Sequence, residues 1–488
     1  MKTVYHCLAV VVLLWLCPLG AHAQASSSQQ SGENQAGTLP SQAGDTVTSA
    51  EPSEPPPALD EHAPVPPPAS IAGPTLAFSE LERGNYLRGG IGLSTTYDDN
   101  VFNTGNQVGN TPSTQMGGFT WSALPHLALD ITTSRLRWTS MYSAGLTVNQ
   151  RLSSQNQGSY SLGTDFEYRL SPHVSVAVTE RFTLTTGFFD SLQSSTDLSG
   201  GGILQQPNSS VVTPLAKSIG NNVSGQLSWQ FGAGSMVGIS GNYFTSRFQD
   251  APAGQSLLDT TTESASAFYS HRITTRNWSG VRYGFEHLTF APGTERADTH
   301  SLMAFHTVYL KPTMQLSFFG GPEYSEVDSQ FVFTQVILPQ VLMTSVPVSN
   351  KRWSGAGGAS YSWQGPRTSI TAEFVRRVTG GGGILGTTQM NSATAGLRRR
   401  VTPSTTLSFG ASYAVNDALM PTTAGIAALK TAMGSAGISR RLGAHFGLEL
   451  SYARVYQEQS SGGGPVVPAN HNRGLVSLSY DFSRPLGR

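Results

Sequence analysis

The end of the chain carries the pattern that most limits its fold, a strict alternation of apolar residues with small or polar ones. In the stretch 474–482, one face of an extended chain would carry Val476, Leu478, Tyr480 and Phe482, and the other Leu475, Ser477, Ser479 and Asp481. A period of two indicates a β-strand whose faces meet different surroundings. Such a strand suits either the edge of a soluble sandwich or the wall of a barrel in lipid. In a barrel, this last strand would pair with the first and leave no open edge.

The same strand resembles the C-terminal signal of bacterial outer-membrane barrels. In that family the barrel-insertion machinery reads a final alternating strand that ends in Tyr-x-Phe, here Tyr480 and Phe482. The resemblance implies these two residues as the insertion signal and the insertion machinery as a partner. Residues 483–488 follow Phe482 here, whereas many family members stop at the aromatic residue.

The first 23 residues have the form of a secretory signal peptide. Lys2 precedes the apolar run 8–16, and Ala21-His22-Ala23 is a small-x-small cleavage site. The run is too short for the alternative, a transmembrane anchor. Both cysteines, Cys7 and Cys17, fall in this segment, so cleavage leaves a mature chain without a disulfide framework.

Residues 24–80 are predicted to be a disordered periplasmic linker. Ser, Gln and Pro dominate this segment, which has seven acidic residues and no Lys or Arg, and such a composition cannot bury a core. We expect a plain tether, with a ligand for a polyproline-binding partner as the alternative.

Composition narrows the class of the remainder, residues 81–488. Charged residues make up 12% of the chain, about half of the roughly 25% usual in soluble domains. Mean hydropathy is −0.17, and no second run approaches the roughly 18 apolar residues of a membrane helix. The protein is therefore either a soluble exported protein or a β-barrel.

Short alternating segments recur through residues 81–488. The clearest, 160–170, puts Phe166 and Tyr168 on one face and Asp165, Glu167 and Arg169 on the other. Tight turns are predicted near 132–134, 171–173, 232–234, 274–276, 311–312, 365–366, 402–404 and 442–443. Longer loops are predicted near 98–114, 149–158, 187–219, 248–259, 291–299, 326–352, 379–388, 417–428 and 457–471. This alternation predicts an all-β fold, a transmembrane antiparallel up-and-down β-barrel of about 18 strands with both ends on the periplasmic, short-turn side.

Aromatic residues gather near both ends of the predicted strands, as membrane interfaces favour. Those near the tight turns are Trp138, Trp229, Trp278 and Trp363. Those near the long loops are Tyr243, Phe244, Phe290, Tyr324 and Trp353.

A second resemblance begins at the first predicted strand. The stretch Gly89–Leu93, followed by Tyr97–Phe102 and closed by 479–488, looks like a class of outer-membrane barrels found beside exopolysaccharide-export genes. It covers residues 85–488. The resemblance implies a porin-like barrel with little established activity.

The sequence offers no catalytic or cofactor constellation. The histidines are scattered, and His300 and His306, which share one strand face, are expected to add ordinary polarity to a lumen rather than to hold a metal. Acidic stretches at 98–100 and 323–328 lack the spacing of a calcium loop, and we expect solvated loops there. The glycine runs 200–202 and 380–383 are interpreted as flexible linkers in outer loops. We predict no enzyme, no metal, no cofactor and no nucleic-acid partner.

The charges of the barrel segment are more informative about function than its histidines, acidic stretches and glycine runs. Lys2 and the seven linker acids are the only charges before residue 81, so 29 of the 30 basic and 23 of the 30 acidic residues belong to the barrel. Inward arginines would favour anions, unless they pair with lumen acids or lipid phosphates. The candidate lumen-lining residues are Asp165, Glu167, Arg169, Arg282, Glu286, Arg398 and Glu449.

These features together predict a barrel in the outer membrane of a Gram-negative bacterium, in contact with outer-membrane lipids and lipopolysaccharide. Barrels of this size enclose an aqueous channel unless plugged. We therefore expect a channel for passive passage of small hydrophilic solutes or for export of a polysaccharide. The alternative is a closed barrel that acts as a surface-exposed structural or adhesive protein through its long loops.

Overall fold

The computed structural model describes residues 85–100, 107–108, 111–112, 117–150, 156–185, 211, 213, 216–249, 257–337, 340–420, 426–461 and 467–486. The predicted signal peptide (1–23), the predicted linker (24–80) and the glycine run 200–202 lie outside these residues. Within the described ranges, no helix is long and apolar enough to cross a bilayer.

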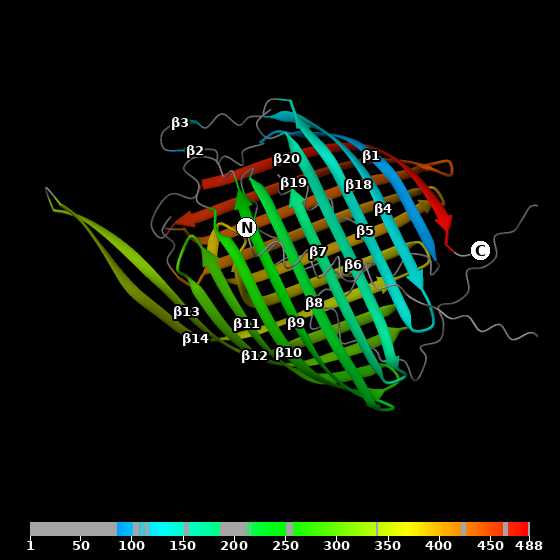
Figure 1. Cartoon of the computed structure of the whole chain (residues 1–488), viewed down its shortest axis with the longest axis horizontal. Coiled ribbons are helices and arrows are strands. Elements are labelled where there is room, and N and C mark those ends of the chain that lie inside the picture. Colours follow the sequence, from blue (N-terminus) through cyan, green and yellow to red (C-terminus); the bar gives the residue numbers. More distant parts are fainter. Residues whose placement is uncertain are drawn as a thin grey trace, which may run out of the picture. The chain divides into compact units, whose positions relative to one another are not determined.

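The described chain folds into one antiparallel sheet of eighteen strands that closes on itself (Figure 1). Its strands are β1 (Tyr86–Asp98), β4 (Gly118–Thr132), β5 (Leu136–Asn149), β6 (Gln157–Ser171), β7 (Val174–Thr185), β8 (Lys217–Gly232), β9 (Ser235–Gln249), β10 (Asp259–Thr274), β11 (Asn277–Ala291), β12 (Arg296–Lys311), β13 (Met314–Ile337), β14 (Gln340–Gln364), β15 (Thr368–Gly381), β16 (Leu385–Thr402), β17 (Thr405–Ala418), β18 (Ile426–Leu442), β19 (Phe446–Ser461) and β20 (Val467–Pro485). Two short strands, β2 (Gln107–Val108) and β3 (Thr111–Pro112), form a separate pair.

Closure occurs between the first and last barrel strands, as the terminal alternation predicts. β1 pairs antiparallel with β20 from Tyr86–Pro485 to Asp98–Arg473, and it pairs with β4 on its other side. At the loop end of this seam, Asp99 accepts hydrogen bonds from the backbone and side-chain amides of Asn472 at 2.7 and 2.6 Å. The expectation of a solvated loop at 98–100 is therefore wrong, because its acidic residues fasten β1 to β20.

The predicted tight turns coincide with the observed ends of the strands at all eight positions. Most predicted long loops also fall between strands. The segment 326–352 is different: β13 and β14 continue through most of it as a two-stranded ribbon, with pairing from Met314–Trp363 to Ile337–Gln340. The ribbon projects well beyond the neighbouring strands in Figure 1.

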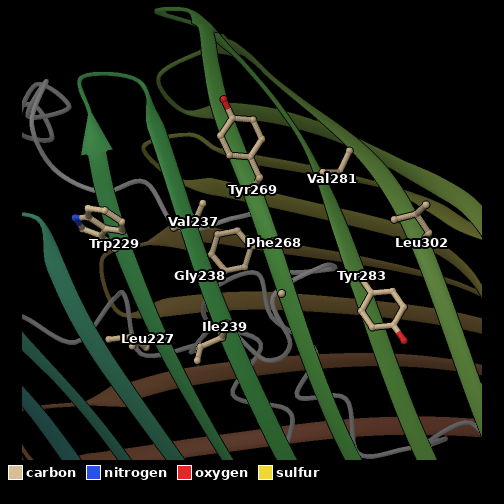
Figure 2. Close-up of a pocket in the computed structure, with 11 residues that line it drawn as sticks. Leu227, Trp229, Val237, Gly238, Ile239, Phe268, Tyr269, Val281, Tyr283 and Leu302 are labelled. Carbon is tan, nitrogen blue, oxygen red and sulfur yellow. The ribbon is translucent and has the colours of Figure 1, made fainter.

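The outer face of the barrel is apolar. Val476, Leu478, Tyr480 and Phe482 are 50, 42, 41 and 43% exposed, and apolar side chains on the same face of the other strands are comparably exposed. Figure 2 shows part of this face, where Ile239, Tyr269, Tyr283 and Leu302 border a shallow apolar depression across β8–β12. A closed sheet with this exterior satisfies its backbone internally and meets hydrocarbon with apolar side chains, as a transmembrane barrel requires.

The observed inward and outward directions of the side chains differ from two expectations, one about the aromatic residues near the long loops and one about His300. Tyr243 and Trp353 are exposed on the outer face, but Phe244 and Phe290 are buried on the inner face, because closeness to a strand end does not determine which way a side chain points. His300 points outward, where its ring lies beside Tyr283 and Phe285. The expectation that His300 lines a lumen is wrong.

Candidate functional site

The inner wall of the barrel carries paired charges on β6 and β7. Asp165 is buried, and the guanidinium of Arg181 donates to its carboxylate at 2.7 Å. On the same face of β6, Glu167 is half-buried and Arg169, next to the tight turn, is exposed. Arg137 of β5 also interacts electrostatically with Asp165. This wall therefore offers alternating positive and negative groups.

A second set of inner charges spans β11, β13 and β15. Arg282 and Glu286 of β11 are half-buried, and both interact electrostatically with Arg377 of β15. Arg377 also interacts with Glu323 and Glu373. Around the closed sheet β15 lies halfway from β6, so Glu373 and Arg377 are on the side of the barrel opposite Asp165.

The other two predicted lumen residues lie apart from these sets. Arg398 is half-buried on β16, opposite Ser369 and Ser408 of the adjacent strands. Glu449 is exposed near the start of β19, opposite Ser439 and Ser477. The structure thus brings Arg282 and Glu286 together, and it does not bring Arg398 or Glu449 to them.

At the long-loop end, the hairpin between β15 and β16 leaves the wall. Pairing of β15 with β14 stops at Gly357–Arg376, although β15 continues to Gly381 and stays paired with β16. Every residue from Val378 to Gly381 and from Leu385 to Met390 is buried, so both faces of each strand are covered. We call residues 378–389 the inner hairpin, since a ribbon covered on both faces lies inside the barrel mouth.

Hydrogen bonds hold the inner hairpin to β13, to the loop between β11 and β12 and to the segment before β10. The backbone N–H of Val378 donates to the carboxylate of Glu323 at 3.1 and 3.3 Å, and the hydroxyl of Ser354 donates to the same carboxylate at 3.2 Å. The backbone N–H of Thr387 donates to Glu295 at 2.6 Å, and that of Leu258 donates to the carbonyl of Gly383 at 2.7 Å.

Glu295 lies in the loop between β11 and β12. Burial raises the pKa of its carboxyl above the ordinary value of 4.5, although the hydrogen bonds from Thr387 act in the opposite direction. The carboxyl also occupies the space that a side chain at Gly386 would need. Glu295 is therefore a titratable loop group in direct contact with the inner hairpin.

Apolar clusters complete the contacts at the mouth. One contains Leu288, Phe290, Ala297, Val327 and Met420, and the other contains Val211, Leu385 and Leu429. The first lies under Gly380, where an added Cβ would be 3.6–3.7 Å from Phe290 and Leu288. The inner hairpin is thus packed against the wall, not suspended in the opening.

The glycines at the tip allow this tight fold. Gly382 and Gly383 have φ angles of 64° and 91°, which side-chain-bearing residues rarely adopt. A Cβ at Gly383 would also overlap the ring of Phe248. The expectation that 380–383 is a flexible linker is wrong, because these glycines form a packed turn.

A polar layer lies between the inner hairpin and the wall. Thr262, Thr299 and Ser325 of the wall and Thr379 and Gln389 of the hairpin are all nearly inaccessible, and each has a side-chain polar atom with no protein partner. Buried polar atoms of this kind normally bind water or a polar molecule. The mouth therefore combines apolar packing with buried polar groups.

Sequence reasoning missed Arg377 and Glu295. The expectation of a solvated loop at 323–328 is wrong, because this stretch belongs to β13 and Glu323 is buried. Alternation alone would have placed Arg377 on the inner face with Val375. The sequence pattern instead predicted a loop from residue 379, so the continuation of the strand was not recognised. Contacts of Glu323 and Glu295 join segments distant in sequence, and no local signal reveals them. Among the described residues, no group of three or more His, Cys, Asp or Glu side chains is arranged to hold a metal.

An apolar exterior, a closed antiparallel sheet and a charged interior define the class, a transmembrane β-barrel. Similar solved structures are the outer membrane protein OpdK of Pseudomonas aeruginosa (10% identity, TM-score 0.38, covering 82% of this chain and 99% of that one) and a BenF-like porin of Pseudomonas fluorescens (10%, 0.40, 81% and 99%). Another is OccK2 of Pseudomonas aeruginosa in complex with glucuronate (11%, 0.39, 83% and 99%). No protein-family model matches this sequence, and no curated protein matches it at a significant level.

Proposed function

We propose that the protein is an outer-membrane channel for passive passage of small hydrophilic solutes. The observation that carries this proposal is the polar inner wall, where Asp165 pairs with Arg181 and Arg377 lies among Glu286, Glu323 and Glu373. A wall of mixed charge keeps a lumen hydrated without a large barrier to either sign of ion. Asp165, Glu167, Arg169, Arg282, Glu286, Arg398 and Glu449 act as lumen-lining residues.

The inner hairpin makes this a narrow channel. It takes up part of the long-loop mouth and is fixed on several sides, so solutes pass beside it. A narrow passage suits small solutes better than a polymer, and polysaccharide export remains only an implication of the sequence resemblance.

The proposal includes the cellular location of the protein. Residues 1–23 direct export, residues 24–80 and the tight turns lie in the periplasm, and the outer face contacts lipid and lipopolysaccharide. The apolar clusters around the inner hairpin favour one alternative, a barrel closed at its mouth that acts as a structural or adhesive surface protein.

Planar-bilayer recording separates these two functions. The full-length barrel is compared with a variant in which residues 381–385 are deleted and β15 is rejoined to β16. A channel gives small, stable conductance steps in the parent and larger steps in the variant, because the deletion removes the tip of the inner hairpin. Faster migration in SDS without boiling serves as the control that both barrels are folded. A parent that stays silent while the folded variant conducts would support the closed barrel, and silence of both would overturn the channel.

A further inference from the structure

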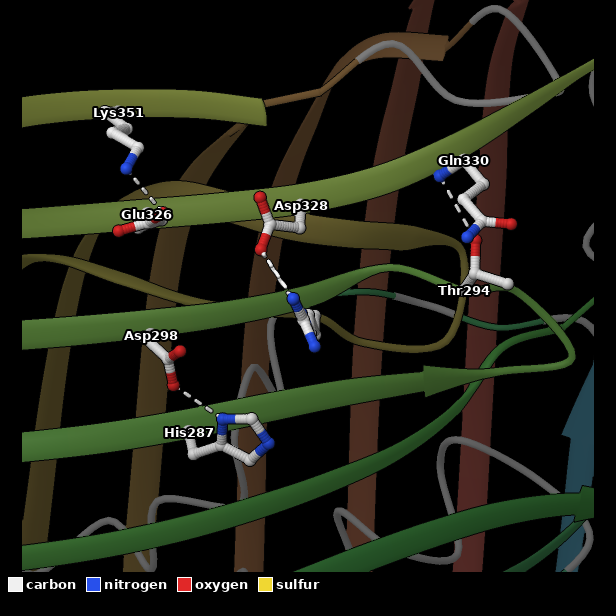
Figure 3. A network of polar contacts seen from close by, with 8 residues as sticks. His287, Thr294, Asp298, Glu326, Asp328, Gln330 and Lys351 are labelled. Carbon is white, nitrogen blue, oxygen red and sulfur yellow. Dashed lines mark hydrogen bonds and ion pairs between the residues drawn. The ribbon is translucent and has the colours of Figure 1, made fainter. Parts of the chain in front are cut away.

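The outer part of the β13–β14 ribbon has free edges on both sides. β12 pairs with β13 only as far as Asp328, and β15 pairs with β14 only as far as Gly357. Beyond these points the described residues of the two strands form strand pairs only with each other, and the backbone N–H of Gln330, at the start of the β13 edge, donates to the hydroxyl of Thr294 at 3.1 Å (Figure 3). We call the described residues 329–337 and 340–348 the outer hairpin. Free edges present unpaired backbone N–H and C=O groups, which pair readily with another strand.

The outer hairpin lacks the charges that usually protect such an edge. From Ser329 to Asn350 the sequence contains no Asp, Glu, Lys or Arg, and the β13 side is rich in strand-forming residues, with Phe331-Val332-Phe333-Thr334 at its centre. On β14, Val346 and Val348 are 41 and 38% exposed. Pro347 lacks an N–H and so interrupts the β14 edge, but no proline or charge interrupts the β13 edge.

Charged residues instead form a collar at the root of this ribbon. On the outer face Arg296 forms an ion pair with Asp328 at 3.1 Å and Lys351 with Glu326 at 2.7 Å, and the ring of His287 is hydrogen-bonded to Asp298 at 2.6 Å. Figure 3 shows the labelled Glu326, Asp328 and Lys351 on the ribbon and Asp298 and His287 on neighbouring strands. The change from a collar of paired charges to an uncharged ribbon occurs at residue 329.

The wall below the collar also allows a neighbour to approach. Trp353 is 71% exposed, more than any other large apolar side chain of the described residues. Directly beneath it, Gly320 is opposite Gly357 and Pro322 is opposite Gly355, so this patch lacks large side chains. β13 and β14 thus provide a patch of small side chains in the wall and, above it, a free strand edge.

From these features we infer that the outer hairpin joins two copies of this chain through their β13 edges. Insertion into lipid is unfavourable, because a two-stranded ribbon would leave backbone groups unpaired in hydrocarbon. An identical edge supplies the missing backbone partners. Since neither edge is charged, no like charges meet across a two-fold axis, and the mixed signs of the collar suit self-association.

Cysteine cross-linking in intact outer membranes tests this interface. Cys7 and Cys17 are the only cysteines, and both fall in the predicted signal peptide, so a single introduced cysteine has no expected background. Under mild oxidation, Phe333→Cys on the β13 edge should form a disulfide-linked dimer, whereas the matched variant Thr344→Cys on β14 should remain mostly monomeric. Adding Val332→Lys and Val336→Lys to the Phe333→Cys chain should reduce the dimer at least tenfold.

Folding and conductance are read in the same variants. The lysine variant should keep heat-dependent migration in SDS and the parent's single-channel conductance, because the changes lie outside the barrel. If Phe333→Cys stays monomeric in membranes where the folded barrel is present, or if the lysines leave the dimer unchanged, the inference is overturned. A channel failure in the bilayer experiment would not affect this outcome.

Discussion

Glu295 shows how one side chain can connect solution pH to the mouth of the barrel. Its carboxyl accepts a 2.6 Å hydrogen bond from the Thr387 backbone, in a position where burial raises its pKa. A raised pKa in the packed state means that the buried position of Glu295 is fully stabilising below the ordinary pKa of 4.5. It becomes less favourable as pH rises through the raised value, because burial of the charged carboxylate is costly. The inner hairpin should therefore be held most firmly in acid.

We expect conductance to rise as pH increases above the ordinary carboxyl pKa of 4.5, because a carboxyl with a raised pKa loses its proton only above that value. Glu295→Gln keeps a neutral hydrogen-bond acceptor at every pH, so this variant should show a smaller rise. Glu326→Gln, which changes an acid of the outer collar, is the matched control and should behave like the parent. An equal pH response in Glu295→Gln and the parent would show that Glu295 does not act on the mouth.

At the scale of single elements, the closing strand both forms part of the lipid-facing wall and carries the expected insertion signal. Substitutions can separate these two roles. Tyr480 and Phe482 lie on the outer face near the tight-turn rim, where a carboxylate in place of an aromatic residue costs only about 0–1 kcal/mol. That cost is too small to prevent folding. Loss of assembly would therefore indicate loss of recognition by the insertion machinery.

The double variant Tyr480→Asp/Phe482→Asp should lose nearly all heat-modifiable barrel from the outer membrane. The matched control, Trp229→Asp/Phe231→Asp, alters two exposed aromatics at the same rim on β8 and should assemble at more than half the parental level. Quantitative immunoblotting of unboiled membrane fractions measures both. Equal assembly of the two variants would refute an insertion signal in the last strand.

Local pattern predicted elements well because strand alternation and turn residues act over short distances. Ser171-Pro172-His173 and Thr402-Pro403-Ser404 marked turns, and the 474–482 alternation marked the closing strand and its outer face. The same reasoning failed where tertiary contacts decide. The inner hairpin is fixed by Glu323 and Glu295, which are distant in sequence, and the uncharged stretch 329–348 pairs with itself as a ribbon instead of forming a loop.

At the scale of the whole molecule, the account depends on a wall with lipid on one side and water on the other. β6 is the best place to test it, since Asp165 is buried on the inner face beside Arg181 while Phe166 is 36% exposed on the outer face. Glu167 and Tyr168 continue the same alternation. A shift of one residue would exchange these two sets.

The most direct measurement is therefore cysteine labelling of β6 in intact membranes with a small, charged thiol reagent. Single cysteines replace Asp165, Glu167, Phe166 or Tyr168 in separate variants, each checked for heat-dependent migration. Asp165→Cys and Glu167→Cys should react and change the conductance, whereas Phe166→Cys and Tyr168→Cys should stay protected by lipid and leave it unchanged. Labelling of Phe166→Cys with protection of Asp165→Cys would show that the inner and outer faces of β6 are the reverse of those described. Equal labelling at all four positions would contradict a membrane wall altogether.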